Sequence, residues 1–105
     1  MIAADVTLRA PIAIPVEIRA DARRTFRLEA AIGEDGMRLE TPVPFEAGRI
    51  VEARFSLPDG PSLVLPARLD GHDGDPAEAL SFLEPPAEAR DALHRYVAAR
   101  LELPS

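Results

Sequence analysis

The chain has 105 residues, a formal net charge of −6 and no cysteine. This length fits a single domain with one core, and the 47% of hydrophobic residues with few aromatics predicts that the core is aliphatic. The negative charge argues against non-specific binding to nucleic acid or anionic lipid, because attraction to phosphates requires positive surface potential. Without cysteine, disulfides, thiolate nucleophiles and cysteine-based zinc sites are excluded.

Residues 1–10 are a weakly patterned lead-in. Charged residues precede the first apolar run, and Pro11 and Pro15 interrupt it, so we expect neither a signal peptide nor a transmembrane span. A cytoplasmic protein is the simplest inference. The run itself alternates, with Ile12, Ile14, Val16 and Ile18 on one face, which predicts one half-buried strand.

A second alternating run follows a polar turn at residues 21–24. It places Phe26, Leu28, Ala30 and Ile32 on the inward face, and we expect an antiparallel hairpin with the first strand. Two registers keep the apolar faces together: one sets Arg19 against Arg27 and Glu17 against Glu29, the other sets Glu17 against Arg27. Opposite charges favour the second register by about 0.2–1 kcal/mol per pair.

Residues 33–36 form a turn in which Gly33 and Gly36 would permit positive φ. Met37 and Leu39 then resume the inward face. Residues 41–48 predict a loop, because two alternate prolines remove ladder donors.

A second hairpin is predicted around the turn at residues 57–61. Its inward side chains share strict alternation: Val51, Ala53, Phe55 and Leu57, then Leu63, Leu65, Ala67 and Leu69. Leu80 and Phe82 mark a short last strand that Pro85 and Pro86 end.

From Ala87 the apolar period becomes helical, with Ala89, Leu93, Tyr96, Val97 and Leu101 on one stripe and a favourable pair between Asp91 and Arg95. About six short strands and one C-terminal helix predict an all-β fold, a small antiparallel barrel or sandwich. We expect a single domain over 1–105, with the barrel at 12–84 and the helix at 86–102.

Several clusters of polar residues fit a structural role better than a site. Asp70, His72, Asp73 and Asp75 lack the order of a calcium loop and the second His or Cys that zinc requires, so we interpret them as a solvated acidic turn. His94 has no nucleophile in a motif context and is interpreted as a surface residue. Met37 and Tyr96 are predicted core residues, and Glu34 and Asp35 solvated carboxylates. No enzymatic set of residues emerges.

Four arginines, Arg19, Arg23, Arg24 and Arg27, lie in and beside the first hairpin turn. Guanidinium groups can clamp phosphates or stack on a purine. The alternative is that the solvent face of a strand and a polar turn need charge.

The segments IGEDGMRLETPVPFEAGRIVEARFSLPDG and EALSFLEPPAEARDALHRYVAAR resemble the central part and the last strand and helix of PilZ domains. The resemblance extends from about Arg9 to Arg100. It implies a six-stranded antiparallel barrel with a C-terminal helix. In that family an Arg-x-x-x-Arg motif and an Asp/Asn-x-Ser-x-x-Gly motif bind the bacterial second messenger cyclic di-GMP.

Aligned to those motifs, this chain keeps one residue of the second, Gly36, and has Ala31 and Gly33 at its polar positions. In the first motif, Arg9 aligns with the second arginine and Asp5 with the first. A carboxylate then stands where an arginine would bind a phosphate, and it repels that phosphate. Arginines with the correct spacing, at 19 and 23 and at 23 and 27, lie one strand too late.

The resemblance therefore favours a PilZ-like adaptor of bacterial cyclic di-GMP signalling or motility that acts through a protein partner, with no cofactor, nucleic acid or membrane insertion. The arginine hairpin and the outer side of the helix are the candidate binding faces. The alternative is a receptor that binds cyclic di-GMP or another nucleotide through Arg9 and the cluster from Arg19 to Arg27, with Gly36 in the turn.

Overall fold

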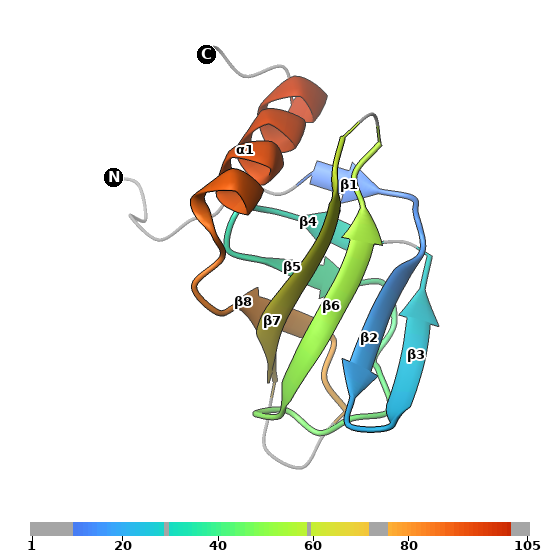
Figure 1. Ribbon diagram of the computed structural model, residues 1–105. Helices are drawn as coiled ribbons and strands as arrows, with labels where there is room; N and C mark the ends of the chain where they lie inside the picture. Colours follow the sequence, from blue (N-terminus) through green and yellow to red (C-terminus); the bar gives the residue numbers. More distant parts are fainter. Residues whose placement is uncertain (1–9, 29, 59, 72–75, 102–105) are drawn as a thin grey trace, which may run out of the picture.

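The computed structural model describes residues 10–28, 30–58, 60–71 and 76–101. In chain order these form β1 (Ala10–Ile12), β2 (Val16–Ala20), β3 (Arg23–Arg27), β4 (Ala30–Ile32), β5 (Gly36–Leu39), β6 (Ile50–Ser56), β7 (Ser62–Asp70), β8 (Ala79–Phe82) and α1 (Ala87–Leu101) (Figure 1). The predicted all-β class with one C-terminal helix is confirmed.

The strands form one antiparallel sheet in the order β1-β4-β5-β8-β7-β6-β2-β3. β1 and β2 are two parts of one stretch of chain, and β3 and β4 are two parts of the next. β1 pairs with β4 at one end of the sheet, and β2 pairs with β3 at the other. If each stretch is counted as one interrupted strand, the pairings form a ring of six, which is the predicted six-stranded barrel.

The interruption at Pro15 corrects the prediction of one strand from Ile12 to Ile18. Proline has no N–H to donate to a ladder, and it lies between β1 and β2. The break lets β1 pair with β4, while β2 pairs with both β3 and β6. The two halves of one stretch thus bond with different neighbours and curl the sheet.

The hairpin of β2 and β3 adopts neither predicted register. Its turn contains only Asp21 and Ala22, with Asp21 at φ 55°, so Arg23 and Arg24 belong to the strand. Short turns fix the pairing, and a shift by one residue moves every side chain to the other face. Glu17 therefore lies opposite Phe26.

The predicted inward face of the second run is consequently wrong in its first half. Phe26 and Leu28 are 51% and 66% exposed, whereas Ala30 and Ile32 are buried as predicted. The interruption between β3 and β4 separates the two halves.

The hairpin of β6 and β7 matches its prediction. Seven residues of each strand pair without interruption, from Ile50 opposite Arg68 to Ser56 opposite Ser62. Its predicted inward residues are buried, except that Leu63 is half-buried. The ring of Phe55 stacks on Phe82 of β8, with centroids 6.2 Å apart.

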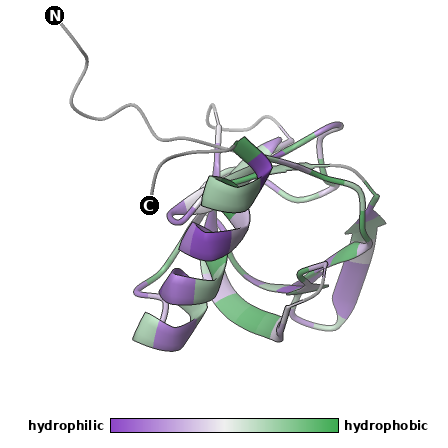
Figure 2. Cartoon of the chain, turned by 90° about the horizontal axis from the view of Figure 1, so that it is seen from above, coloured by the Kyte–Doolittle hydropathy of each residue, from purple (hydrophilic) through white to green (hydrophobic). Residues whose placement is uncertain are grey.

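Helix α1 packs on the barrel beside β1 (Figure 1). It buries Ala89, Leu93 and Val97, and Tyr96 is half-buried, with its hydroxyl donating to the Pro11 carbonyl oxygen at 2.7 Å. Hydrophilic residues occupy much of its visible side when the molecule is seen from above (Figure 2). Within the described residues, no helix has the length and apolar character needed to span a membrane.

Candidate functional site

The turn between β4 and β5 is where the resemblance places a ligand motif. Its closing hydrogen bond runs from the Gly33 N–H to the Gly36 carbonyl oxygen, at 2.9 Å. Gly33 and Gly36 could adopt positive φ, but among the described glycines positive φ occurs at Gly48 and Gly71. A Cβ on Gly36 would overlap the Leu80 carbonyl oxygen. Gly36 is therefore required by the close approach of β5 to β8.

The two other motif positions have no side chain that can hydrogen-bond a ligand. Ala31 lies in β4 opposite Pro11 of β1 and Arg38 of β5, and it is half-buried. Gly33 is buried. A methyl group and a hydrogen atom thus stand where the family motif has a carboxylate or amide and a hydroxyl.

Glu34, which we predicted to be solvated, is 45% exposed and also contacts the helix. Its Oε2 lies 2.8 Å from Nδ1 of His94, so the turn is tied to α1. His94 lies on the surface, as predicted, with its side chain 62% exposed. The neighbouring carbonyl oxygen of Asp35 accepts a hydrogen bond from the Phe82 N–H at 2.8 Å, which holds the turn to β8.

The four arginines of the first hairpin divide between the two faces of the sheet. Arg24 lies on the outer face with Glu17 and Arg19, while Arg23 and Arg27 share a face with the buried residues of β2. Arg27 donates to the carbonyl oxygens of Thr41, at 3.2 Å, and of Pro42. Its guanidinium therefore holds the loop after β5 against the edge strand β3.

Arg23 packs on Phe45 of the same loop. The guanidinium carbons of Arg23 and Arg49 lie 5.2 and 5.7 Å from the centre of this ring, within the range of a cation–π contact. Arg49 also pairs with Asp21 in the turn between β2 and β3, at 2.5 Å. Sequence reasoning missed Phe45 and Arg49; the alternation of Val43 and Phe45, both buried, was the available signal.

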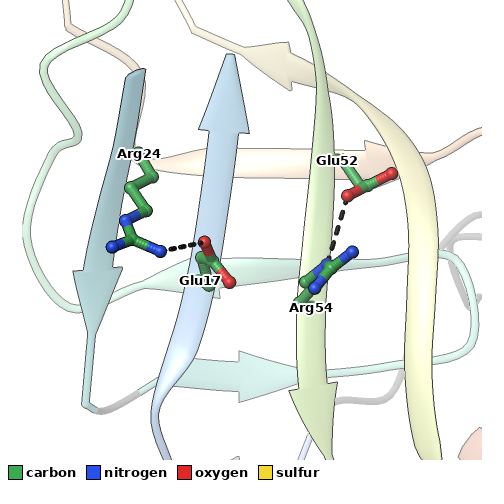
Figure 3. A network of polar contacts seen from close by, with 4 residues as sticks. All are labelled: Glu17, Arg24, Glu52 and Arg54. Carbon is green, nitrogen blue, oxygen red and sulfur yellow. Dashed lines mark hydrogen bonds and ion pairs between the residues drawn. The ribbon is translucent and has the colours of Figure 1, made fainter. Parts of the chain in front are cut away.

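The outer face holds a polar network across β3, β2 and β6 (Figure 3). Nη1 of Arg24 lies 3.7 Å from Oε2 of Glu17, and Nε of Arg54 lies 3.2 Å from Oε1 of Glu52. Glu17 is the least exposed of the four, with 14% of its side chain exposed. Arg19 has no ion pair among the residues that the structure describes.

Some predicted residues lie outside the described part of the chain: Arg9 and Asp5 of the first motif, and His72, Asp73 and Asp75 of the acidic loop. Asp70 lies at the end of β7, where it accepts a hydrogen bond from the Ser81 hydroxyl at 2.5 Å. Within residues 10–28, 30–58, 60–71 and 76–101, no three His, Asp or Glu side chains are grouped to hold a metal ion.

The described arginines of the sequence-predicted set do not converge on one point. The structure brings Arg23 and Arg27 to the loop after β5, and leaves Arg19 and Arg24 on the opposite face. Gly36 is the first residue of β5, directly after the turn between β4 and β5.

The comparison with curated proteins finds no match to this chain. The comparison with protein families matches residues 7–99 to the PilZ domain. This span includes every strand and nearly all of α1, and the ring of six antiparallel strands followed by a helix agrees with it. The chain therefore belongs to the PilZ domain family, the domains of cyclic di-GMP signalling.

Proposed function

We propose that this PilZ domain is an adaptor that acts through protein–protein interaction and does not bind cyclic di-GMP itself. The observation that carries this proposal is the turn between β4 and β5, where Ala31 and Gly33 offer a ligand no hydrogen-bonding side chain. Buried polar groups of a nucleotide need partners, and each one left unpaired costs about 1–3 kcal/mol. The barrel is therefore present, whereas the hydrogen-bonding side chains of the motif are absent.

The contacts of Glu34 support the same conclusion. This carboxylate lies two residues before Gly36, in the turn where the resemblance places a ligand motif, and a carboxylate repels a phosphate that comes close to it. Its pairing with His94 draws α1 towards the turn. Replacing that contact with one to a nucleotide would require the pair to separate.

The arginine cluster also favours the adaptor. Arg27 uses its guanidinium on two loop carbonyl oxygens, and Arg23 packs on Phe45. A nucleotide that recruited them would have to displace these contacts. An adaptor of this kind needs neither cofactor nor catalytic group, and we expect it to act in the cytoplasm, in signalling or motility.

Calorimetry with cyclic di-GMP tests the proposal. We expect no saturable heat at nucleotide concentrations up to about 1 mM. A dissociation constant above this concentration corresponds to a binding free energy of less than about 4 kcal/mol in magnitude. The matched variants are Arg9→Ala and Arg23→Ala. Saturable binding at micromolar concentrations that either substitution abolishes would establish the alternative, a receptor that uses Arg9 and the arginines from Arg19 to Arg27.

The adaptor role needs its own positive measurement. A protein captured by the chain from its native host is purified, and its binding to the chain is measured with and without cyclic di-GMP. We expect a complex whose affinity is the same in both conditions. If no captured protein binds the purified chain, or if binding requires the nucleotide, the adaptor proposal is wrong.

A further inference from the structure

A groove is lined by residues of α1, of the turn between β6 and β7 and of the connection from β1 to β2. Figure 1 shows where these three segments lie in the fold. Its volume is about 620 Å³, within the range of pockets that bind ligands. It is far from the turn between β4 and β5 in sequence and shares none of that turn's residues. The residues that line it are Ala13, Ile14, Leu57, Pro58, Gly60, Pro61, Ala92, Arg95, Tyr96, Ala99 and Arg100.

The helix contributes one continuous stripe to this groove. The stripe follows the spacing i, i+3, i+4, i+7, i+8 and consists of Ala92, Arg95, Tyr96, Ala99 and Arg100. It is distinct from the buried stripe of Ala89, Leu93 and Val97, which packs on the barrel. Two of its members are alanines, whose methyl groups leave the space between α1 and the turn unfilled.

The floor of the groove is apolar. Leu57 is buried and Ile14 is half-buried, and prolines 58 and 61 stand on the side of the turn. The Tyr96 hydroxyl already donates to the Pro11 carbonyl oxygen, so its ring is left as apolar surface. An apolar side chain that entered this space would gain about 25 cal/mol for each Å² removed from water.

Arginines supply the charge. Within the described residues that line the groove, the charged side chains are Arg95 and Arg100. Arg95 lies 4.0 Å from Asp91, but both side chains are at least 75% exposed, and such pairs hold weakly. Arg100 has no ion pair among the described residues. The groove is thus apolar with a cationic rim, in a chain whose net charge is −6.

We propose that this groove docks a segment of a partner protein in which an apolar side chain is flanked by Asp or Glu. The apolar side chain enters between Ile14, Leu57 and Tyr96, and the carboxylates pair with Arg95 and Arg100. A basic segment would bring like charges to the same rim, which costs affinity. This inference rests on the proposed adaptor function and names the surface and the partner chemistry.

A phage-displayed library of random peptides, selected on the immobilised chain, tests the inference. Recovered peptides are synthesised with a fluorescent label, and their affinity is measured by polarisation. Four proteins are compared: the unchanged chain, Arg100→Glu, Ala99→Trp, which fills the groove, and Arg90→Glu. Arg90 is an exposed arginine of the same helix that does not line the groove, so it is the matched control.

We expect peptides with an apolar residue flanked by Asp or Glu. Their affinity falls about tenfold or more with Arg100→Glu, is lost with Ala99→Trp, is unchanged with Arg90→Glu, and weakens as salt increases. Thermal unfolding midpoints are compared for all variants. If Ala99→Trp lowers the unfolding midpoint of the chain, Arg100→Gln takes its place in the comparison. This variant removes one charge without adding bulk, and it must still weaken peptide binding.

The inference is wrong if no peptide is enriched, if the enriched peptides are rich in Lys and Arg, or if they bind Ala99→Trp as tightly as the unchanged chain. It is also wrong if light scattering shows a dimer that Ala99→Trp dissociates, because the occupant is then a second copy of the chain. These outcomes leave the calorimetric test of the proposed function untouched. Binding of a host protein that Ala99→Trp does not weaken would keep the adaptor and reject this groove.

Discussion

The two hairpins of the barrel, β2 with β3 and β6 with β7, are built from similar residues and arranged in opposite ways. Each contains one phenylalanine, and the first has four arginines where the second has two. In the β6–β7 hairpin Phe55 points into the core and Arg54 lies outside. In the β2–β3 hairpin Phe26 lies outside, and Arg23 and Arg27 lie on the face that the core residues share.

The position of each hairpin in the sheet explains the difference. β6 and β7 each have a strand on both sides, so their inward faces meet other apolar faces. β3 is at the end of the sheet, and the loop after β5 runs past it instead of a strand. That loop presents free carbonyl oxygens, and a guanidinium group can donate to several of them. At such an edge, arginine on the inner face closes the barrel.

The largest expected effect compares the two phenylalanines. We expect Phe55→Ala to lower the free energy of unfolding by about 3–5 kcal/mol, because it leaves a cavity beside Phe82. Phe26→Ala, on a half-exposed side chain, should cost about 1 kcal/mol or less. Urea unfolding followed by circular dichroism measures both. Equal losses would mean that the two rings are equally buried and that the described arrangement of the first hairpin is wrong.

The next effect concerns the arginine that holds the loop. We expect Arg27→Ala to lower the free energy of unfolding by about 1–2 kcal/mol, because the carbonyl oxygens of Thr41 and Pro42 lose their donor. Arg27→Lys should recover little of this, since one ammonium group lacks the planar fork.

Arg19→Ala is the control for Arg27. Arg19 lies on the outer face of the same hairpin, and its loss should change stability by no more than about 0.5 kcal/mol. If both alanine variants unfold at the same urea concentration, Arg27 does not hold the loop.

The smallest effect tests what interrupts the first strand. We expect Pro15→Ala to destabilise the chain by about 0.4–1 kcal/mol through the greater freedom of the unfolded state. β1 and β2 should stay separate, because they pair with different strands. Hydrogen exchange observed by NMR should then show an unprotected amide at position 15. A strongly protected amide there would show that proline alone caused the break.

The second hairpin and the helix were predicted well from the sequence, because their apolar periodicity matches the faces that their neighbours bury. From Val51 to Leu57 every second residue is apolar, and a turn with proline and glycine follows at once. In α1, the contact between Asp91 and Arg95 is local and follows from helical spacing alone. Such features depend little on distant parts of the chain.

The first hairpin and the candidate site depend on distant parts, and there the sequence was insufficient. Phe26 fitted the alternation of an inward face, but the two-residue turn at Asp21 set another register. The exposure of Glu34 was predicted, but its contact with His94 was not, because the two residues are 60 positions apart in the sequence. The identity of the motif residues could be predicted, whereas the contacts that replace a ligand could be found only in three dimensions.

Gly36 changes how a sequence match to the ligand motif should be weighed. Its hydrogen faces the backbone of β8 at a distance that admits no side chain, so any chain that keeps the pairing of β5 and β8 must keep glycine here, whether or not it binds a nucleotide. A glycine at position 36 therefore indicates the barrel fold. Within this motif, only positions 31 and 33 indicate whether a ligand can be hydrogen-bonded. In a PilZ sequence that matches the motif at this glycine alone, the pairing of β5 with β8 accounts for the match, which is then no evidence of a ligand.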